Sequence, residues 1–213
     1  MTNSSSPIPP DRYHTIGGIA EAEIKIQRSR FIGLAGHASD EKSAREFIAA
    51  AAKKYHDSRH VCFGWRLGTP PQERENRSDD GEPSGTAGEP ILTEIRKRQL
   101  SELVVVVVRY FGGIKLGTGG LARAYGQGAQ LALQEAVVRE VLQGIDFALC
   151  FPYALQKTIR HLIAQNDGKI VTEEYGADVH WQIWLPHSQC APFQARLTEA
   201  TSGDIQLEPK NPT

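Results

Sequence analysis

The feature that most constrains the fold is the apolar run Leu103–Val108, which reads LVVVVV. Every position is apolar and five of the six are β-branched, a pattern typical of a central β-strand covered on both faces. The next twenty-one residues, 109–129, read RYFGGIKLGTGGLARAYGQGA and hold seven glycines. The most strand-like segment of the chain is therefore followed by its most permissive one. Either the backbone comes close to another group there, or it only needs tight turns.

A strand, a glycine loop and a helix in succession is an arrangement by which backbone N–H groups hold an anion. The helix is predicted over 118–137, where Thr118 can cap it or bond a phosphate oxygen. Arg109 and Lys115 can supply positive charge. The P-loop pattern GxxxxGK[ST] is absent, because no lysine follows the relevant glycines. Two interpretations stay open: contact with a phosphate or nucleic-acid backbone, and glycine turns that serve the fold alone.

Two later glycines, Gly126 and Gly128, fall inside the predicted helix. Each costs a helix about 1 kcal/mol relative to alanine. We expect them to allow close packing of the helix on the sheet.

A second stretch of interest is SDDGEPSGTAGEP, residues 78–90, in a predicted loop over 68–89. Loops of this length inside a compact domain are usually functional or disordered. An EF-hand is excluded because its twelfth position would be Ala87 instead of glutamate. The turn-forming pairs Asp-Gly, Glu-Pro and Ser-Gly favour a solvated acidic turn. The alternative is Mg²⁺ binding or general-base chemistry by the three acids of this loop: Asp79, Asp80 and Glu82.

A third stretch, HDSRHVCFGWRLG, places His60 and Cys62 on one face of a predicted strand, 60–67. A cysteine beside a histidine is typical of thiol nucleophiles. Neighbours on one strand rarely have the geometry of a catalytic triad, and the sequence offers no third member. A single His-x-Cys pattern also falls short of a metal site.

The rest of the chain predicts an α+β protein of two domains, preceded by a flexible tail over residues 1–14. Alternation predicts a half-buried strand over 20–27. A hairpin partner follows, and then a helix capped by Ser39. The second domain, predicted over 143–213 after a first domain over 15–142, has the element order βαββαβ. That order is the one of the ferredoxin-like fold.

Composition narrows the class of function. The 213 residues carry a formal net charge of -1, whereas a protein that coats nucleic acid has a large basic excess. Any nucleic-acid contact must therefore rest on a local basic patch. The three cysteines form no CxxC pair, so neither a disulfide framework nor a zinc site is indicated. No signal-peptide or transmembrane pattern is present, so we expect a cytoplasmic protein without a membrane partner.

Taken in order, four segments resemble the IMPACT family, and specifically its bacterial YigZ-type members. They are RSRFIG, RHVCFGW, SDDGEPSGTAGEP and VVVVVRYFGGIKLGTGGLARAYG. The combination of the last two is highly specific, and the resemblance covers nearly the whole chain. Departures are small: Glu89 stands where lysine is common, and Gly64 replaces a usual alanine.

The resemblance implies a first domain similar to the ribosomal-protein fold shared with GHMP kinases and with domain IV of elongation factor G. The second domain would be similar to domain V of that factor. The relatives of both domains in elongation factor G work near RNA. Eukaryotic IMPACT proteins relieve translational repression. The resemblance therefore favours binding to RNA, the ribosome or a translation-related partner. Our leading hypothesis is a non-enzymatic binding protein that needs no cofactor.

Our leading hypothesis places the contact on the glycine stretch, with Arg28 and Arg30 as possible flanking cations. The candidate contact residues are Arg109, Tyr110, Gly112, Gly113, Lys115, Gly117, Thr118, Gly119, Gly120 and Arg123. One alternative is an enzyme that binds a nucleotide or phosphorylated metabolite at this stretch, with Mg²⁺ held by the acidic loop. The acidic-loop candidates are Asp79, Asp80, Glu82, Ser84 and Thr86.

Another alternative is a regulator that binds a protein partner through the first domain and forms dimer contacts through the second. The Mg²⁺–phosphate alternative requires the acidic loop and the glycine stretch to line one cleft. It loses its basis if they lie on opposite sides of the domain.

Overall fold

The structure, a computed structural model, describes residues 9–210. The described chain divides into two compact units, one over residues 13–141 and one that combines residues 9–12 with residues 142–210. Of the expected tail over 1–14, residues 1–8 lie outside the described part of the chain. Its last residues belong to a strand, β1 (Arg12–Gly17). Tyr13, Thr15 and Ile16 of this strand are buried.

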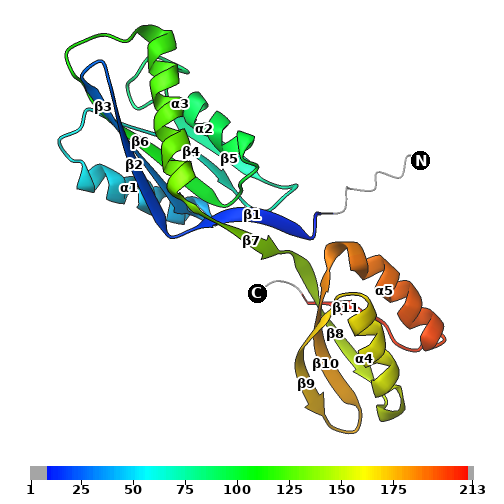
Figure 1. The fold of residues 1–213 in the computed structure, drawn as a ribbon. Coiled ribbons are helices and arrows are strands. Elements are labelled where there is room, and N and C mark those ends of the chain that lie inside the picture. Colours follow the sequence, from blue (N-terminus) through cyan, green and yellow to red (C-terminus); the bar gives the residue numbers. More distant parts are fainter. Residues whose placement is uncertain (1–8, 211–213) are drawn as a thin grey trace. The chain divides into compact units, whose positions relative to one another are not determined.

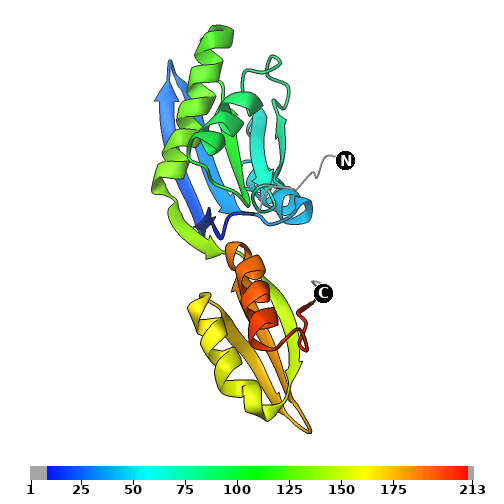
Figure 2. The same ribbon diagram turned by 90° about the vertical axis from the view of Figure 1, so that its right-hand side faces the viewer.

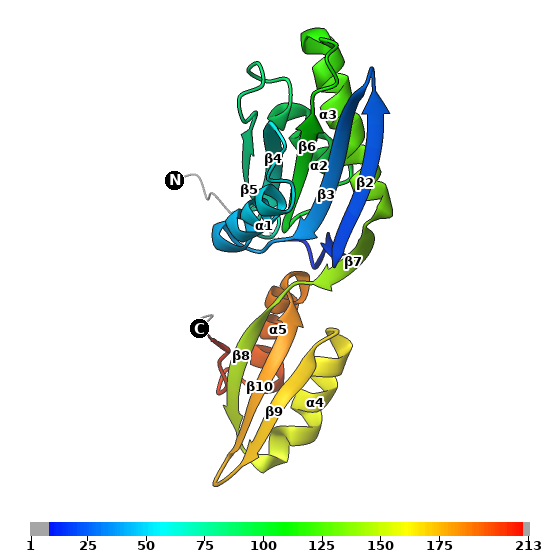
Figure 3. The same ribbon diagram turned by 90° about the vertical axis from the view of Figure 1, so that its left-hand side faces the viewer.

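The first unit is built on a five-stranded sheet in the order β2-β3-β6-β4-β5, and every neighbouring pair in it is antiparallel. Helices α2 and α3 cover one face and α1 covers the other (Figures 1 and 3). The strands are β2 (Ile19–Ile26), β3 (Ser29–His37), β4 (His60–Leu67), β5 (Arg74–Ser78) and β6 (Leu103–Tyr110). The helices are α1 (Glu41–Lys54), α2 (Gly88–Lys97) and α3 (Gly117–Glu135). A separate two-stranded sheet pairs β1 with β7 (Val137–Leu142).

The apolar run forms the middle strand of this sheet, as its composition predicted. Residues 103–108 are fully buried. Side chains of a strand alternate between the two faces, so Leu103, Val105 and Val107 pack toward α2 and α3. The intervening valines pack toward α1. This alternation decides the direction of the two residues that follow the run, because Arg109 continues the first row and Tyr110 the second.

Some element boundaries differ from the expected ones for local reasons. Helix α1 is capped by Asp40 instead of Ser39, since the Asp40 carboxylate accepts from the Ser43 N–H at 2.8 Å. The Ser43 hydroxyl in turn accepts from the Asp40 N–H at 3.2 Å, which completes a capping box. Helix α2 begins at Gly88, one residue before the end of the expected loop over 68–89, and Pro90 lies in its first turn.

The expected loop over 68–89 contains a strand, β5, that the sequence analysis missed. Its sequence, RENRS, has no apolar alternation. The charged side chains of this edge strand form ion pairs with neighbouring elements, for example Arg77 with Glu89 at 2.8 Å and Glu75 with Arg96 at 2.6 Å. An edge strand that is polar throughout has no alternation of apolar and polar residues, so its sequence is indistinguishable from that of a loop.

Close approach of α3 to the sheet depends on glycine at two facing positions. A Cβ atom on Gly33 of β3 would lie 2.2 Å from the carbonyl oxygen of Gly128 in α3. A Cβ atom on Gly128 would lie 3.1 Å from Val107. Helix–sheet packing therefore accounts for Gly128 as expected. It does not account for Gly126, whose Cβ would make ordinary contacts at 3.8 Å with Pro90.

The second unit has four strands in the order β11-β8-β10-β9, and each neighbouring pair is antiparallel. Helices α4 and α5 cover one face, in front in Figure 2 and behind in Figure 3. The elements are β8 (Gly144–Phe151), α4 (Gln156–Gln165), β9 (Lys169–Tyr175), β10 (Val179–Pro186), α5 (His187–Ala200) and β11 (Glu208–Pro209), with a short helical turn at Tyr153–Leu155. This order confirms the predicted βαββαβ arrangement and the α+β fold class. Within residues 9–210 no helix is long and apolar enough to cross a membrane.

Replacing Gly33 with alanine should destabilise the first unit by at least about 2 kcal/mol, because the new methyl group meets backbone that cannot move aside. Gly126→Ala is the matched control. Its methyl group finds room, and the change should be neutral or stabilising by up to about 1 kcal/mol. Denaturant unfolding of both variants measures the difference. Equal stability of the two variants would show that α3 does not need its close approach to β3.

Candidate functional site

A cavity of about 390 Å³ lies in the first unit, where β6 ends and α3 begins. It brings together the glycine stretch and the acidic loop, which are far apart in the sequence. The residues that line it come from four segments: Arg59 and His60; Glu82 and Pro83; Arg109 and Phe111; and Lys115, Leu116, Gly117, Thr118 and Leu121. The two candidate stretches therefore share one cleft.

The position of Arg109 follows from the sheet register. Residues directly opposite in an antiparallel pair point to the same face, and Arg109 lies opposite Phe31 of β3 and His60 of β4. These three side chains form a row across the sheet on the side of α3. The Arg109 guanidinium lies 5.5 Å from the ring centre of Phe31 and 5.3 Å from that of Phe111, so aromatic rings fix its orientation.

A buried ion pair joins the two candidate stretches. Arg109 Nη1 donates to Glu82 Oε1 at 2.6 Å, and the two side chains are only 6% and 4% exposed. The Tyr125 hydroxyl of α3 donates to the same carboxylate oxygen at 2.8 Å. Within the described residues, the buried Nε of Arg109 has no hydrogen-bond partner. The pair thus leaves one buried donor of the guanidinium unused beside the cavity.

His60 presents one ring nitrogen near this ion pair. Its Nδ1 lies 2.7 Å from the carbonyl oxygen of Asp80, and a carbonyl can only accept, so Nδ1 carries a proton and donates it. The other nitrogen, Nε2, lies 3.8 Å from Glu82 Oε1. Because Nδ1 is held by the backbone, Nε2 is the nitrogen that can exchange a proton or accept a hydrogen bond.

Positive charge without a protein partner lies at the same cavity. Arg59 and Lys115 both line it, both are exposed, and across residues 9–210 neither forms a hydrogen bond or ion pair. The start of α3 also lies here. Its N-cap residue, Leu116, supplies no side-chain hydrogen bond, so the first N–H groups of the helix need another acceptor. Two free cations and an uncapped helix start together favour an anion.

The acidic loop mostly stabilises its own fold. The Asp79 carboxylate accepts from the N–H groups of Gly85, Ala87 and Gly88 at 2.8 to 2.9 Å. It thereby caps the start of α2. Burial opposes the ionisation of Asp79, but these three backbone bonds outweigh it and lower the pKa of the carboxyl group. Asp80 accepts from the Val61 N–H at 2.6 Å. Of the three candidate acids, only Glu82 reaches the cavity.

This arrangement fits Mg²⁺ poorly, because the carboxylate oxygens that would bind it already accept protein hydrogen bonds. Within the described part of the chain, no three histidine, cysteine, aspartate or glutamate side chains are grouped as metal ligands. Thr86 donates to the carbonyl oxygen of Pro83 at 2.6 Å and is buried. Ser84 is exposed and does not line the cavity.

Several candidate contact residues lie apart from the cavity. Tyr110 is on the opposite sheet face, where its hydroxyl donates to Asp57 at 2.6 Å. Arg123 lies in a separate hollow between α2 and α3, together with Glu89 and Glu94. Gly119 and Gly120 occupy the first turn of α3 and do not line the cavity.

Two glycines of the stretch are needed for backbone reasons. A Cβ atom on Gly112 would lie 2.0 Å from the backbone of Arg28, at the turn between β2 and β3. Gly113 has a positive φ of 86°, a conformation that glycine adopts at no steric cost. At Gly112 the backbone therefore does come close to another group, and that group is the chain itself.

Cys62 is excluded as a nucleophile. Its side chain is buried in the core between the sheet and helices α2 and α3, and its thiol donates to the Asp79 carbonyl oxygen at 3.0 Å. Burial raises the pKa of the Cys62 thiol to about 12, so almost none of it is thiolate at neutral pH. The pairing of His60 with Cys62 thus serves the fold.

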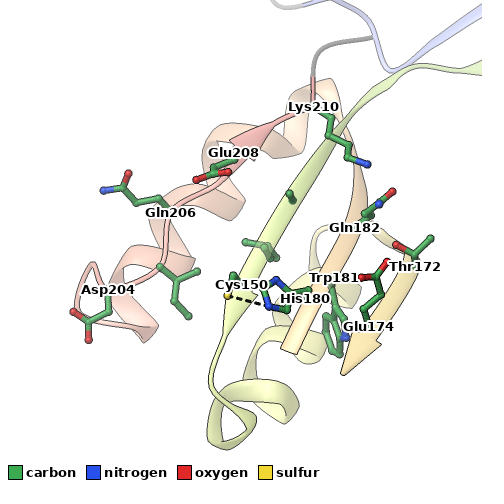
Figure 4. A pocket seen from close by; sticks show the side chains of 13 residues that line it. Cys150, Thr172, Glu174, His180, Trp181, Gln182, Asp204, Gln206, Glu208 and Lys210 are labelled. Atoms are coloured by element: carbon green, nitrogen blue, oxygen red, sulfur yellow. Dashed lines mark hydrogen bonds between the residues drawn. The ribbon is translucent and has the colours of Figure 1, made fainter. Parts of the chain in front are cut away.

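A second cavity, of about 610 Å³, lies on the sheet face of the second unit that the helices leave open (Figure 4). Cys150 and His180 line it, with Sγ and Nε2 separated by 3.8 Å. Its charged residues are mostly acidic: Glu174, Asp204 and Glu208 against the single lysine Lys210. An acidic excess disfavours phosphate, so this cavity is a weaker candidate for anion binding than the one beside α3.

Sequence reasoning missed Arg59, Phe111 and Tyr125 as parts of the site. Tyr125 was hidden because its ring faces the core in the middle of a helix. Arg59 directly precedes His60, and Phe111 lies two residues after Arg109; His60 and Arg109 belong to the row that crosses the sheet. The pairing of His60 with Arg109 would have placed Arg59 and Phe111 at the site, but recognising it requires the register of β4 against β6.

Removing one charge of the buried pair should destabilise the first unit. Glu82→Gln leaves Arg109 charged and buried without a counter-ion, and we expect a loss of about 3 kcal/mol in the free energy of unfolding. The control is Glu23→Gln, which opens an exposed pair with Arg30 and should cost no more than about 1 kcal/mol. Denaturant unfolding measures both. A loss for Glu82→Gln as small as that for Glu23→Gln would contradict a structural role for the pair.

Comparison with known proteins agrees with this architecture. Residues 27–133 match the family described as the Impact N-terminal domain, and residues 149–204 match a domain of unknown function, DUF1949. The IMPACT family member YigZ of Escherichia coli (strain K12) is 38% identical over 184 residues, 86% of this chain and 90% of that protein.

An IMPACT family member of Thermus thermophilus is 44% identical over 184 residues, 86% of this chain and 99% of that protein. A crystal structure described as that of a hypothetical protein superposes with a TM-score of 0.66 at 33% identity, and covers 95% of this chain and 99% of that one. The chain therefore belongs to the IMPACT family.

Proposed function

We propose that this chain is a non-enzymatic regulatory protein that binds RNA, either free or in the ribosome, through the cavity beside α3. One observation carries the proposal: two unpaired cations, Arg59 and Lys115, meet the uncapped start of α3 at one cavity. Phosphate is the anion that such a combination holds most often in proteins. The proposal includes a cytoplasmic location, in keeping with the three free cysteines.

The net charge of the chain limits how RNA is bound. A formal charge of -1 gives no long-range attraction for a polyanion, so affinity must come from the few cations near the cavity. Contacts to phosphate fix position without reading sequence. Binding is therefore expected to depend on salt and to show little preference among RNA sequences.

The alternative of a Mg²⁺-dependent enzyme has less support. Asp79 and Asp80, which would hold the metal, already accept backbone hydrogen bonds, and Glu82 pairs with Arg109. What remains in favour of a small phosphorylated ligand is the size of the cavity, about 390 Å³, which lies in the range of small-molecule sites. The size of the cavity therefore concerns whether it takes an internal phosphate of RNA or the phosphate of a small molecule.

The choice of variant for a test follows from the burial of each cation. Arg109 is unsuitable, because Arg109→Glu would place a second carboxylate beside Glu82 in a buried position. Arg59 and Lys115 are exposed and unpaired, so Arg59→Glu with Lys115→Glu reverses the charge of the cavity without breaking an interaction. The matched control reverses two exposed, unpaired lysines on the side of the sheet that α1 covers, Lys25 and Lys53.

We expect the Arg59→Glu, Lys115→Glu variant to bind RNA and purified ribosomes at least about tenfold more weakly than the parent, since it loses two phosphate contacts and repels the backbone. The slope of log K against log salt is negative, and its magnitude should fall by about two on the same ground. The Lys25→Glu, Lys53→Glu control should retain the parent affinity. Filter binding and ribosome co-sedimentation across a salt series measure these quantities.

Equal losses in both double variants would mean that only net charge matters, and the proposal would fail. Unchanged binding in the Arg59→Glu, Lys115→Glu variant would also exclude the cavity as the contact. Ribosome binding that survives nuclease removal of accessible RNA would instead favour a protein partner.

A further inference from the structure

The charges and volume of the cavity point to a narrower class of ligand. We propose that the cavity takes a phosphate monoester, either the terminal phosphate of an RNA chain or a free mononucleotide, in preference to an internal phosphodiester. This inference rests on the proposed function, because it specifies which phosphate of an RNA the same site holds.

The first argument is the balance of charge. Three cationic side chains line the cavity, Arg59, Arg109 and Lys115, against the single carboxylate of Glu82. Arg109 and Glu82 neutralise each other at 2.6 Å, which leaves two positive charges and the partial charge of the helix start. A phosphate monoester carries about -1.5 to -2 at pH 7, whereas each diester of a nucleic-acid backbone carries a single negative charge. The monoester matches the charge that the cavity leaves uncompensated.

The second argument is an unused donor in the buried wall of the site. Arg109 is 5% exposed, lines the cavity, and spends only Nη1 on Glu82 among the described residues. Its buried Nε lacks a partner. A buried donor without a partner costs free energy, and an acceptor brought to this Nε by a small movement of the Arg109 side chain would remove that cost. A terminal phosphate has three unesterified oxygens to offer, one more than a diester.

The third argument is size. The cavity, about 390 Å³, falls at the small end of the range for sites that enclose small molecules, about 300–1,000 Å³. It suits one nucleotide better than a continuous strand that enters and leaves. Four apolar residues also line it: Pro83, Phe111, Leu116 and Leu121. The Phe111 ring is 45% exposed and offers a surface on which a base can stack.

His60 supplies a further contact for such a ligand. With Nδ1–H held by the Asp80 carbonyl, Nε2 accepts a hydrogen bond when the ring is neutral and donates one when it is charged. A ribose hydroxyl can meet either state, whereas a phosphate oxygen accepts from the charged ring. We assign His60 a binding role and no chemical step.

The test compares oligoribonucleotides of one sequence, ten nucleotides long, that differ only at their ends: hydroxyl at both ends, phosphate at the 5′ end, or phosphate at the 3′ end. Fluorescence anisotropy at fixed salt measures their affinities for the full chain. We expect at least one phosphorylated form to bind at least tenfold more tightly than the hydroxyl form. Lys115→Gln should abolish this preference, and the control Lys25→Gln should keep it.

A second arm measures binding of a nucleoside 5′-monophosphate and of the matching nucleoside by calorimetry. This arm separates the two sources of the monoester. If all three oligoribonucleotides bind equally, the protein binds RNA as proposed but the monoester inference is wrong. If the mononucleotide binds and no RNA does, the inference holds with a free nucleotide as ligand and the RNA function is wrong. If neither the mononucleotide nor any RNA binds, both fail.

Discussion

The site depends on one buried interaction, the ion pair between Arg109 at the end of β6 and Glu82 in the acidic loop. Arg109 is there because alternation along β6 turns it toward α3, and Glu82 reaches it because Asp79 fastens the loop to the start of α2. Tyr125 adds a bond from the middle of α3. The pair and its bond from Tyr125 therefore link a strand, a loop and a helix.

A buried ion pair is weak evidence for stability, since burial of both charges offsets much of their attraction. Its role here is to position and neutralise the Arg109 guanidinium. By neutralising Arg109, Glu82 allows a guanidinium to sit in the wall of a cavity without dominating its charge. The exposed cations Arg59 and Lys115 then set the net charge that a ligand meets. The acidic loop is in this sense a structural partner of the anion site, which explains how acids and cations come to share one cleft.

The sequence predicted the architecture well because its signals are periodic. The apolar run requires a strand with two covered faces, and βαββαβ can be recognised from alternating helix and strand patterns. Strand β5 was missed because RENRS is polar throughout and finds its partners only in three dimensions. The cap of α1 was displaced by one residue because both Ser39 and Asp40 can cap, and only Asp40 meets Ser43.

The site was predicted in part. Glycines and cations in one stretch marked Arg109, Lys115 and Thr118, and all three line the cavity. The sequence alone predicts that Tyr110 and Arg109 point to opposite faces of the sheet, because successive side chains of a strand alternate. The pairing of Glu82 with Arg109 could not be read from the sequence, because it joins residues far apart in the chain through the fold of a loop. Arg59 required the register of β4 against β6 for the same reason.

The most direct test of the account locates the phosphate. In an amide-resolved NMR titration, the full chain is titrated with the phosphate monoester that binds it most tightly, either a terminally phosphorylated oligoribonucleotide or a nucleoside 5′-monophosphate. The account predicts saturable shifts that are largest for the N–H groups of residues 117–120. Shifts should extend to residues 59 and 60, on the other side of the cavity. Shifts confined to the second unit, or an absence of saturable shifts at the start of α3, would contradict it.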